Sequence, residues 1–376
     1  DARQETRLSK APMTASPIAR HIARRLALQL PTLLGESLLT FLLIRMVPGD
    51  PAQVMLGEHA TAEQVARFQA EMGLDRPLPL QYVHYLAHLA RGDWGRSIKT
   101  NLPVMAELSQ RLPATIELGA AALLLACAAG IPLGVLAAHR PRSPFAWLAT
   151  EGSLVGVSVP LFWVGLLAAH LFGYRLGWLP PSGRLGLDVE LRSISAAWAG
   201  SPVCGWVPGA CTGILGDSLS NFYLLAGLLT GNLPALADAL AHLALPALTL
   251  SVVPLAVIVR MTRACVRDVL AHDYVRTARA KGLSEWATVM RHALRSAALP
   301  ILTAISLQAG LLFSGAILVE TIFSWPGIGQ LVVDRVLARD YPVVQGLVLA
   351  TGLLLIAINL AADVACGLLD PRIRYE

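Results

Sequence analysis

The residues with the spacing of a metal site are His84 and His88. They stand four apart in a stretch with helical apolar spacing, which would place both imidazoles on one helix face. No third ligand lies nearby in the sequence, and the complementary face is apolar, with Val83, Leu86, Ala87 and Ala90. We therefore interpret the pair as two histidines on the polar face of a helix and predict no metal site.

Residue patterns for covalent chemistry are weak. An intramembrane hydrolase needs facing Ser/His, Asp/Asp or His/Glu groups, yet His170 and His242 lie at the ends of apolar segments without an evident nucleophile. The phosphate-binding pattern G-x-x-x-x-G-K-[ST] does not occur in the sequence. We predict that this chain is not an enzyme and binds no cofactor itself, so any ATP hydrolysis must occur on another polypeptide.

A third group of polar residues stands in the apolar segment 300–322. Ser306, Gln308 and Glu320 are candidates to line a polar path, because polar side chains inside a bilayer usually face a cavity or a partner. Hydrogen bonds between neighbouring helices explain any one of them equally well. Both interpretations stay open from the sequence.

Apolar segments must position these residues. The chain has 376 residues, 55% of them hydrophobic and 15% charged, which excludes an ordinary soluble enzyme. Six segments have the roughly 20 mostly apolar residues that a helical crossing needs. We predict an all-α polytopic membrane protein with six transmembrane helices at 26–44, 116–138, 146–172, 243–259, 300–322 and 343–369.

The distribution of charge gives the orientation. Segment 260–298 carries eight Lys and Arg residues against three acids, and segments 1–25 and 139–145 on that side are also basic. The loops on the opposite side carry no such excess, so the basic side is cytoplasmic and both termini lie inside. The first apolar segment is too long for a signal peptide and has no cleavage site, so we predict a retained helix after an N-terminal tail at 1–25.

Two external loops are long. Loop 46–113 predicts two short helices at 62–72 and 80–90, and loop 173–240 predicts irregular structure with a short apolar helix at 222–229. Cys204 and Cys211 fall in this second loop, where an oxidising compartment would permit a local disulfide. Two unpaired thiols are the alternative.

The cytoplasmic segment 260–299 predicts two short helices lying across the membrane face. The first covers 273–281 and ends at Gly282, and the second starts at Ser284, a good N-cap residue. The small residues Ala278 and Ala280 would admit another backbone nearby. The alternative is a basic loop that only fixes topology and contacts anionic membrane lipid.

Sequence motifs in this segment and beyond resemble a known family. The run RTARAKG at 276–282, followed by ALP at 298–300, resembles the coupling loop of ATP-binding-cassette (ABC) importer permeases, although Arg276 occupies its acidic first position. PGDP at 48–51, GDWGRS at 92–97, ETIFSWPGIG at 320–329 and RDYPVVQG at 339–346 extend the match. The chain resembles the B-type permease subunit of dipeptide and oligopeptide importers. An insert at 200–232 has no counterpart in a typical member of that family.

The resemblance implies an importer in the bacterial inner membrane that works by alternating access on a peptide. Expected partners are a homologous second permease, two ATP-binding subunits that hold ATP and Mg²⁺, and an external solute-binding protein; no nucleic acid is expected. The ATPases would dock on Arg276, Thr277, Ala278, Arg279, Ala280, Lys281, Gly282 and Leu283.

The resemblance also implies an external gate and a platform for the binding protein. Candidate residues are Asp50, Trp325, Pro326, Asp340 and Tyr341. An alternative role for Trp325 is that of an anchor at the membrane interface. We also predict a short helix at 331–337. The chain then divides into the tail, a first helix with its external loop at 26–113, and a core permease domain at 114–376.

Two alternatives concern function. Related permeases import nickel complexes or glutathione, and here only His84 and His88 would favour the import of a metal. A proton-coupled secondary transporter would need a relay of membrane carboxylates and often an internal repeat, and we find neither in the sequence.

Overall fold

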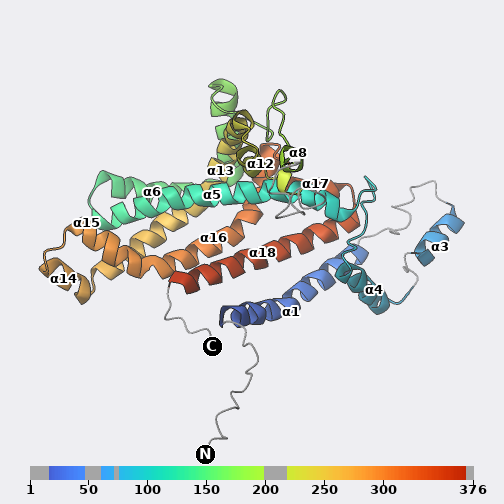
Figure 1. Ribbon diagram of the computed structural model, residues 1–376, viewed down its shortest axis with the longest axis horizontal. Helices are drawn as coiled ribbons and strands as arrows, with labels where there is room; N and C mark the ends of the chain where they lie inside the picture. The colour runs from blue at the N-terminus through green and yellow to red at the C-terminus, as the bar shows by residue number, and fades with distance from the viewer. Residues whose placement is uncertain (1–16, 47–60, 72–75, 199–217, 370–376) are drawn as a thin grey trace, which may run out of the picture.

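The computed structural model describes residues 17–46, 61–71, 76–198 and 218–369. Regular structure within these ranges is helical, apart from one isolated bridge between Arg96 and Pro103. The long helices are elongated in the same general direction (Figure 1), as expected for a bundle that crosses a bilayer. They are α1 (Pro17–Met46), α5 (Val104–His139), α13 (Leu233–Leu270), α16 (Leu294–Ile322) and α18 (Tyr341–Leu369).

Helix α13 is the centre of the bundle and packs closely on α5. Close packing is possible because α5 has glycines where the two helices meet. A Cβ atom at Gly134 would lie 2.6 Å from the Cβ of Thr262 and 2.8 Å from the carbonyl oxygen of Val259. The α5–α13 pair therefore depends on the missing side chain at this position.

Helix α1 packs along α18. Near the chain ends, Arg25 of α1 forms an ion pair with Asp363 of α18 at 3.2 Å. Farther along, the carboxyl group of Glu36 lies directly against Gly352, where a Cβ atom would collide with it. These contacts place the acid of the first apolar segment at the contact between α1 and α18.

The helices of the described residues correspond to the six predicted segments with one correction. Four are long and apolar enough to cross a membrane, namely α5, α13, α18 and the continuous helix Glu285–Ile322. Two consecutive helices, Pro144–Ser158 and Leu161–Arg175, are bent against each other and together could form a fifth crossing. Helix α1 covers the remaining predicted segment but is not among the helices that meet this requirement of length and apolar composition.

The prediction of one continuous helix at 146–172 was wrong. The chain forms α6 (Pro144–Ser158) and then α7 (Leu161–Ala168), which continues into the π-helical segment η1 (Ala169–Arg175), and the two parts meet at 101°. Val159 has an extended backbone and Pro160 follows it. Proline disfavours helical conformation in the preceding residue, which accounts for the break.

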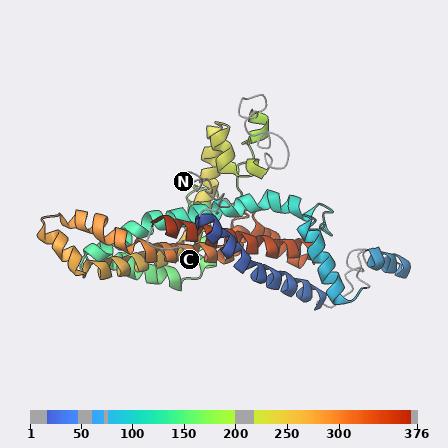
Figure 2. The same ribbon diagram turned by 60° about the horizontal axis from the view of Figure 1, so that its bottom comes forward.

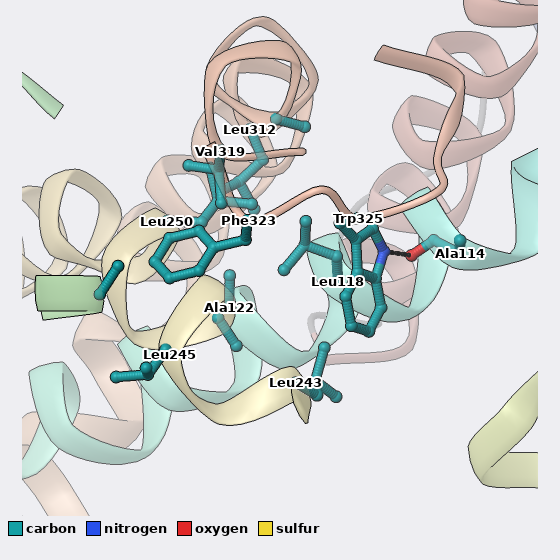
Figure 3. Packing of buried hydrophobic residues seen from close by; sticks show 13 residues of the cluster. Ala114, Leu118, Ala122, Leu243, Leu245, Leu250, Leu312, Val319, Phe323 and Trp325 are labelled. Carbon is teal, nitrogen blue, oxygen red and sulfur yellow. Dashed lines mark hydrogen bonds between the residues drawn. The ribbon is translucent and has the colours of Figure 1, made fainter. Parts of the chain in front are cut away.

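The main apolar core lies where α5, α13 and the end of α16 meet (Figure 3). Phe323 and Trp325, in the turn that follows α16, insert among leucines of α5 and α13. The indole Nε1 of Trp325 donates a hydrogen bond to the carbonyl oxygen of Ala114 at 2.9 Å. Labelled members of this core are Ala114, Leu118, Ala122, Leu243, Leu245, Leu250, Leu312, Val319, Phe323 and Trp325.

The two ends of the bundle carry different short elements (Figures 1 and 2). One end has α14 (Asp273–Ala280), α15 (Glu285–Ala287) and the π-helical segment η2 (Thr288–Ala293), and α1 starts and α18 finishes toward this end. The other end has α3 (Ala62–Glu71) and α4 (Leu78–Ala90).

Shorter elements complete the described chain. Helices α8 (Ile194–Trp198) and α12 (Tyr223–Leu229) lie to one side of α5, and α17 (Ile328–Leu337) lies alongside its N-terminal half. The predictions of short helices at 62–72, 80–90, 222–229 and 331–337 are confirmed by α3, α4, α12 and α17.

Candidate functional site

Helix α14 separates its apolar and charged residues sharply. Val275 and Ala278 are buried and face the rest of the chain. Asp273 and Arg276 are exposed and form only an i,i+3 ion pair at 3.3 Å. The outer face of α14 is therefore charged and exposed to solvent, and its Asp273–Arg276 ion pair is local to the helix.

The end of α14 is fixed by Gly282, as the sequence predicts. Gly282 has a φ of +82°, which favours glycine, and no atom lies within 4 Å of the position of its missing Cβ. Its N–H donates to the carbonyl oxygen of Arg279 at 2.9 Å, and the N–H of Leu283 donates to that of Ala278 at 3.4 Å. These bonds form a Schellman motif, which ends the helix and reverses the chain.

Seven of the eight predicted docking residues are exposed, and Ala278 is the exception. Ala278 packs inward, so it is not available to another protein in this structure. Large apolar side chains are exposed at the same end of the bundle, notably Tyr274, Trp286 and Met290. Apolar and charged side chains mixed at a polar end of a membrane protein are typical of a protein-binding surface.

The second predicted short helix does not end before the fifth span, which is a correction. Ser284 caps its start, and its Oγ accepts a hydrogen bond from the N–H of Ala287 at 3.3 Å. From there α15, η2 and α16 continue without interruption as Glu285–Ile322, 38 residues. An ion pair of 2.9 Å between Arg279 and Glu285 ties α14 to this helix.

At the other end of α16, a buried carboxylate holds three elements together. Glu320 is fully buried, and its Oε1 accepts a hydrogen bond from the Thr115 hydroxyl of α5 at 2.6 Å. Its Oε2 accepts the N–H of Gln330, in the first turn of α17, at 3.0 Å. The Thr115 oxygen in turn accepts the N–H of Ile328 at 2.8 Å. We call Thr115, Glu320 and residues 325–330 the Glu320 clamp.

Two glycines leave room for the carboxylate of the clamp. A Cβ atom on Gly327 would collide with the Glu320 carboxyl group, and one on Gly329 would lie 2.7 Å from the Cα of Ile317. The carboxylate also lies at the N-terminus of α17, where the helix dipole favours negative charge. The PGIG sequence is therefore needed for packing as well as for the turn.

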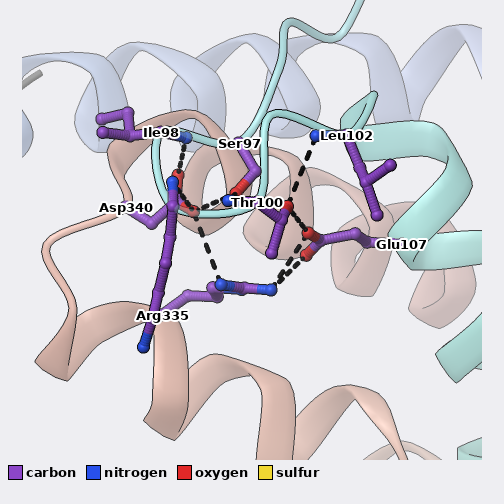
Figure 4. A network of polar contacts seen from close by, with 8 residues as sticks. Ser97, Ile98, Thr100, Leu102, Glu107, Arg335 and Asp340 are labelled. Carbon is purple, nitrogen blue, oxygen red and sulfur yellow. Dashed lines mark hydrogen bonds and ion pairs between the residues drawn. The ribbon is translucent and has the colours of Figure 1, made fainter.

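A second polar group lies nearby and is shown in Figure 4. Asp340 is fully buried and accepts hydrogen bonds from the Ser97 hydroxyl at 2.5 Å and the Ile98 N–H at 3.0 Å. Arg335 of α17 lies 3.8 Å from Asp340 and 3.0 Å from Glu107 of α5, and Glu107 also accepts the Thr100 hydroxyl. This Asp340 network joins the loop before α5 to the turn between α17 and α18.

The predicted gate residues have different environments. Trp325 and Asp340 are buried, so the interpretation of Trp325 as an interfacial anchor was wrong. Pro326 and Tyr341 are half-buried. Asp50 and the disulfide candidates Cys204 and Cys211 lie outside the described residues.

The predicted path residues are not gathered at one polar surface. The Ser306 hydroxyl donates to the carbonyl oxygen of Leu302 in its own helix at 2.9 Å, and Ser306 borders an almost wholly apolar cavity of about 310 Å³ between α5, α16 and α18. Gln308 is buried, and Glu320 is enclosed in its clamp. In this conformation none of the three lines a wet channel.

Sequence reasoning missed a buried ion pair. Arg184 lies 2.6 Å from Glu117 of α5, donates to the carbonyl oxygen of Asn221 at 2.7 Å, and stacks on the Tyr223 ring at 3.7 Å. Glu117 also accepts the N–H of Leu224 at 2.9 Å. An acid in an apolar segment calls for a partner, but nothing in the sequence indicates which arginine supplies it.

The two histidines of α4 do lie together on an exposed face. His88 contacts His84 on one side and Asp93 on the other, both at 3.0 Å. Hydrogen bonds from His88 and from the backbone N–H of Gly95 hold the pKa of Asp93 below its usual value. No group of three or more His, Cys, Asp or Glu side chains suited to a metal occurs within the described ranges.

Family models match most of the chain. Residues 130–375 match the binding-protein-dependent transport system inner membrane component, and residues 18–119 match the N-terminal part of membrane components of such transport systems. The two matches together include α14, the Glu320 clamp and the Asp340 network.

Curated relatives are similar over nearly their whole length. The dipeptide transport system permease protein DppB of Escherichia coli K12 is 44% identical over 356 residues, 94% of this chain and 98% of the relative. The di/tripeptide transport system permease protein DppB of Pseudomonas aeruginosa UCBPP-PA14 is 45% identical, with 94% and 98% covered. A probable D,D-dipeptide transport system permease protein, DdpB of E. coli K12, is 38% identical, with 90% and 93% covered.

Proposed function

Because the chain belongs to the family of inner membrane components of binding-protein-dependent transport systems, we propose that it moves peptides across the inner membrane by alternating access. The chain is a multi-pass permease subunit of a peptide importer of the ABC type. Its relatives are named for dipeptides and tripeptides, which does not favour nickel complexes or glutathione as the cargo.

The observation that carries the mechanism is the continuous helix from Glu285 to Ile322. At 1.5 Å per residue, its 38 residues extend about 57 Å, which exceeds the roughly 40–45 Å of a bilayer with its headgroups, so the helix continues beyond the membrane. One end receives α14 through the ion pair of Arg279, and the other end carries Glu320 and its clamp. A rigid helix of this kind moves both ends together.

The motor in this proposal is a pair of separate ATP-binding subunits that hold ATP and Mg²⁺. They dock on the exposed residues of 276–283 and on the apolar side chains beside them, which favours a protein partner over lipid alone. Closure of the ATPases around nucleotide displaces α14, and the continuous helix passes the displacement to the outer end. The chain itself carries out no hydrolysis.

Sidedness follows from charge in this proposal. The end with α14 is basic and cytoplasmic, as are both chain termini, whereas α3, α4 and the loop before α5 face the external solute-binding protein. Asp340 and Trp325 are buried, so in this proposal they stabilise the surface that receives the binding protein and do not contact that protein themselves. Pro326 and Tyr341 are half-buried and belong to the surface itself. For Asp50, a role in contact with the binding protein stays a prediction from the sequence.

The peptide path runs between this chain and a homologous second permease subunit. A peptide cannot cross hydrocarbon with its amides unpaired, since each would cost several kcal/mol. Ser306 and Gln308 are assigned to polar surface that becomes accessible when the helices separate. Glu320 is assigned to the outer boundary of this path, where its clamp closes the bundle.

The test uses the complete importer reconstituted in liposomes. Gly282→Trp places a bulky side chain on the docking surface and strains the positive φ. We expect it to leave membrane insertion intact, to lower ATP-driven peptide uptake at least tenfold and to uncouple ATP hydrolysis from uptake. The matched control is Gly177→Trp, because Gly177 also has a positive φ, +63°, and no atom within 4 Å of its missing Cβ.

Two results would contradict the proposal. Unchanged uptake in Gly282→Trp would remove the docking role of this segment. Uptake that needs a proton gradient and continues without ATP would instead indicate a secondary transporter.

A further inference from the structure

The two histidines of α4 are arranged as a pair of ligands. The Nε2 atoms of His84 and His88 lie 3.0 Å apart, and their rings are inclined at 62° with centroids 4.5 Å apart. Two nitrogen ligands about 2.1 Å from one cation are about 3.0 Å apart when their bonds meet at a right angle, and about 3.4 Å apart in a tetrahedron. The observed separation equals the first value, and a small rotation of the rings would turn both nitrogens from their mutual hydrogen bond toward one cation.

Asp93 fixes the orientation of His88. The Nδ1 atom of His88 lies 3.0 Å from Oδ2 of Asp93, and Oδ1 of Asp93 accepts the N–H of Gly95 at 3.1 Å. A carboxylate that accepts the Nδ1 proton leaves the lone pair of Nε2 free to face His84. Histidines that bind metals usually have such a partner on their other nitrogen, which sets the tautomer and raises ligand basicity.

The backbone brings Asp93 to this position. Gly92, with a φ of +82°, ends α4, and the N–H of Asp93 donates to the carbonyl oxygen of His88 at 3.0 Å. The N–H of Gly92 donates to the carbonyl oxygen of Leu89 at 3.0 Å and completes a Schellman motif. The turn thus places the carboxylate beside the same turn of helix that carries His88.

The opposite face of α4 is held against α1, which keeps the histidines outward. The Tyr82 hydroxyl forms hydrogen bonds with Ser37 at 2.8 Å and with the carbonyl oxygen of Leu34 at 3.1 Å. The centroid of the Phe41 ring lies 5.2 Å from that of Tyr82 and 5.8 Å from that of Tyr85. The side chains of His88 and Asp93 are 42% and 60% exposed, so a hydrated ion reaches them directly.

We propose that His84 and His88 bind one first-row divalent cation of the Zn²⁺, Ni²⁺ and Cu²⁺ class through their Nε2 atoms. Imidazole nitrogens suit these cations, whereas Mg²⁺ and Ca²⁺ prefer oxygen. When the cation binds, the proton on Nε2 of neutral His84 is lost to water and Nδ1 of His84 takes up a proton in its place, so both histidines stay neutral and each offers the lone pair of Nε2. Water occupies its remaining coordination positions, since three-ligand groups do not occur in the part of the chain that the structure describes.

The test is calorimetric titration of the purified full-length protein, stripped of metal by a chelator, with NiCl₂ and with ZnCl₂. We expect one site, at least tenfold weakened by His84→Ala and by His88→Ala. Asp93→Asn keeps both nitrogen ligands and removes only the orienting carboxylate, so affinity should fall about tenfold. The matched control is His272→Ala, another exposed histidine, which should leave this site unchanged.

Copper gives a second readout, the number of imidazole nitrogens bound to the ion. Electron paramagnetic resonance of one bound Cu²⁺ should show two imidazole nitrogens in the unchanged protein and one in either histidine variant. Equal affinity of the unchanged protein and the His84→Ala variant overturns the site, and unchanged affinity in Asp93→Asn overturns the positioning role of Asp93. Transport is not measured, so neither result depends on the proposed function.

Discussion

The end of this permease that carries α14, proposed as the coupling end, and the end that carries the Glu320 clamp, proposed as the outer end, use charge in opposite ways. At the coupling end, the side chains of Arg276 and Asp273 are 73% and 93% exposed and form one local ion pair. At the outer end, Glu320 and Asp340 are fully buried, and each is bound by groups from distant parts of the chain. The difference indicates which surface is kept free for a partner and which one is fixed within the chain.

The energetics of the two ends differ for the same reason. A carboxylate taken out of water costs several kcal/mol unless donors replace the lost water, so each donor at the outer end is needed. An exposed ion pair contributes at most about 1 kcal/mol, because water and salt compete for both partners. Substitutions at the outer end should therefore affect folding, and those at the coupling end should affect function.

The largest effect is expected for Gly327→Val in the Glu320 clamp. The new side chain would occupy the position of the Glu320 carboxyl group and force it away from the Thr115 hydroxyl and the Gln330 N–H that it accepts. We expect a loss of at least about 3 kcal/mol, seen as a much lower apparent melting temperature in detergent. Gly152→Val is the control, because no atom lies within 4 Å of that position. Similar melting temperatures for the two variants would break the comparison.

A smaller effect is expected for Thr115→Val, which preserves shape and removes one hydroxyl. The change leaves Oε1 of Glu320 without its donor and the N–H of Ile328 without its acceptor. Two unpaired buried groups should cost about 2 to 4 kcal/mol of unfolding free energy. The control is Thr303→Val, since Thr303 is exposed and its hydroxyl bonds only to the carbonyl oxygen of Leu299. Thermal unfolding that does not distinguish the two would show that the clamp contributes little.

The smallest effect on stability is expected for Arg276→Ala at the coupling end. Loss of one exposed i,i+3 ion pair should change the unfolding free energy by less than about 0.5 kcal/mol. Uptake by the reconstituted importer should nevertheless decrease, because Arg276 lies on the proposed docking surface. If Arg276→Ala instead lowered the melting temperature strongly and left ATP-driven uptake normal, this residue would contribute to stability and not to docking.

Most elements could be predicted from the sequence because their signals are local. The long apolar segments of the sequence predicted the long helices. The glycine at position 282 predicted the end of α14, and the structure gives it the positive φ that favours glycine there. The break at Pro160 could not be predicted, because Pro113 and Pro132 lie inside α5 without breaking it. Whether a proline interrupts a helix depends on packing that the local sequence does not contain.

The site was harder to predict because its contacts are remote. Glu320 was identified as a polar residue in a membrane helix, but its partner Thr115 lies 205 positions away, and Ser97 lies 243 positions from Asp340. The signal for Glu117 was an unexplained acid, and its partner Arg184 lies in a loop of irregular structure. Periodicity identifies the face of a helix, and only the tertiary fold determines which faces meet.

The π-helical segment Thr288–Ala293 has a consequence for how such a transporter can change over time. A π-helical turn holds about one residue more than an α-helical turn, so its gain or loss rotates everything before it about the helix axis. A single insertion or deletion there would change the direction of α14 while the membrane-crossing part of α16 kept its own neighbours. The position of the proposed docking surface could thus change without any change in the packing of the bundle.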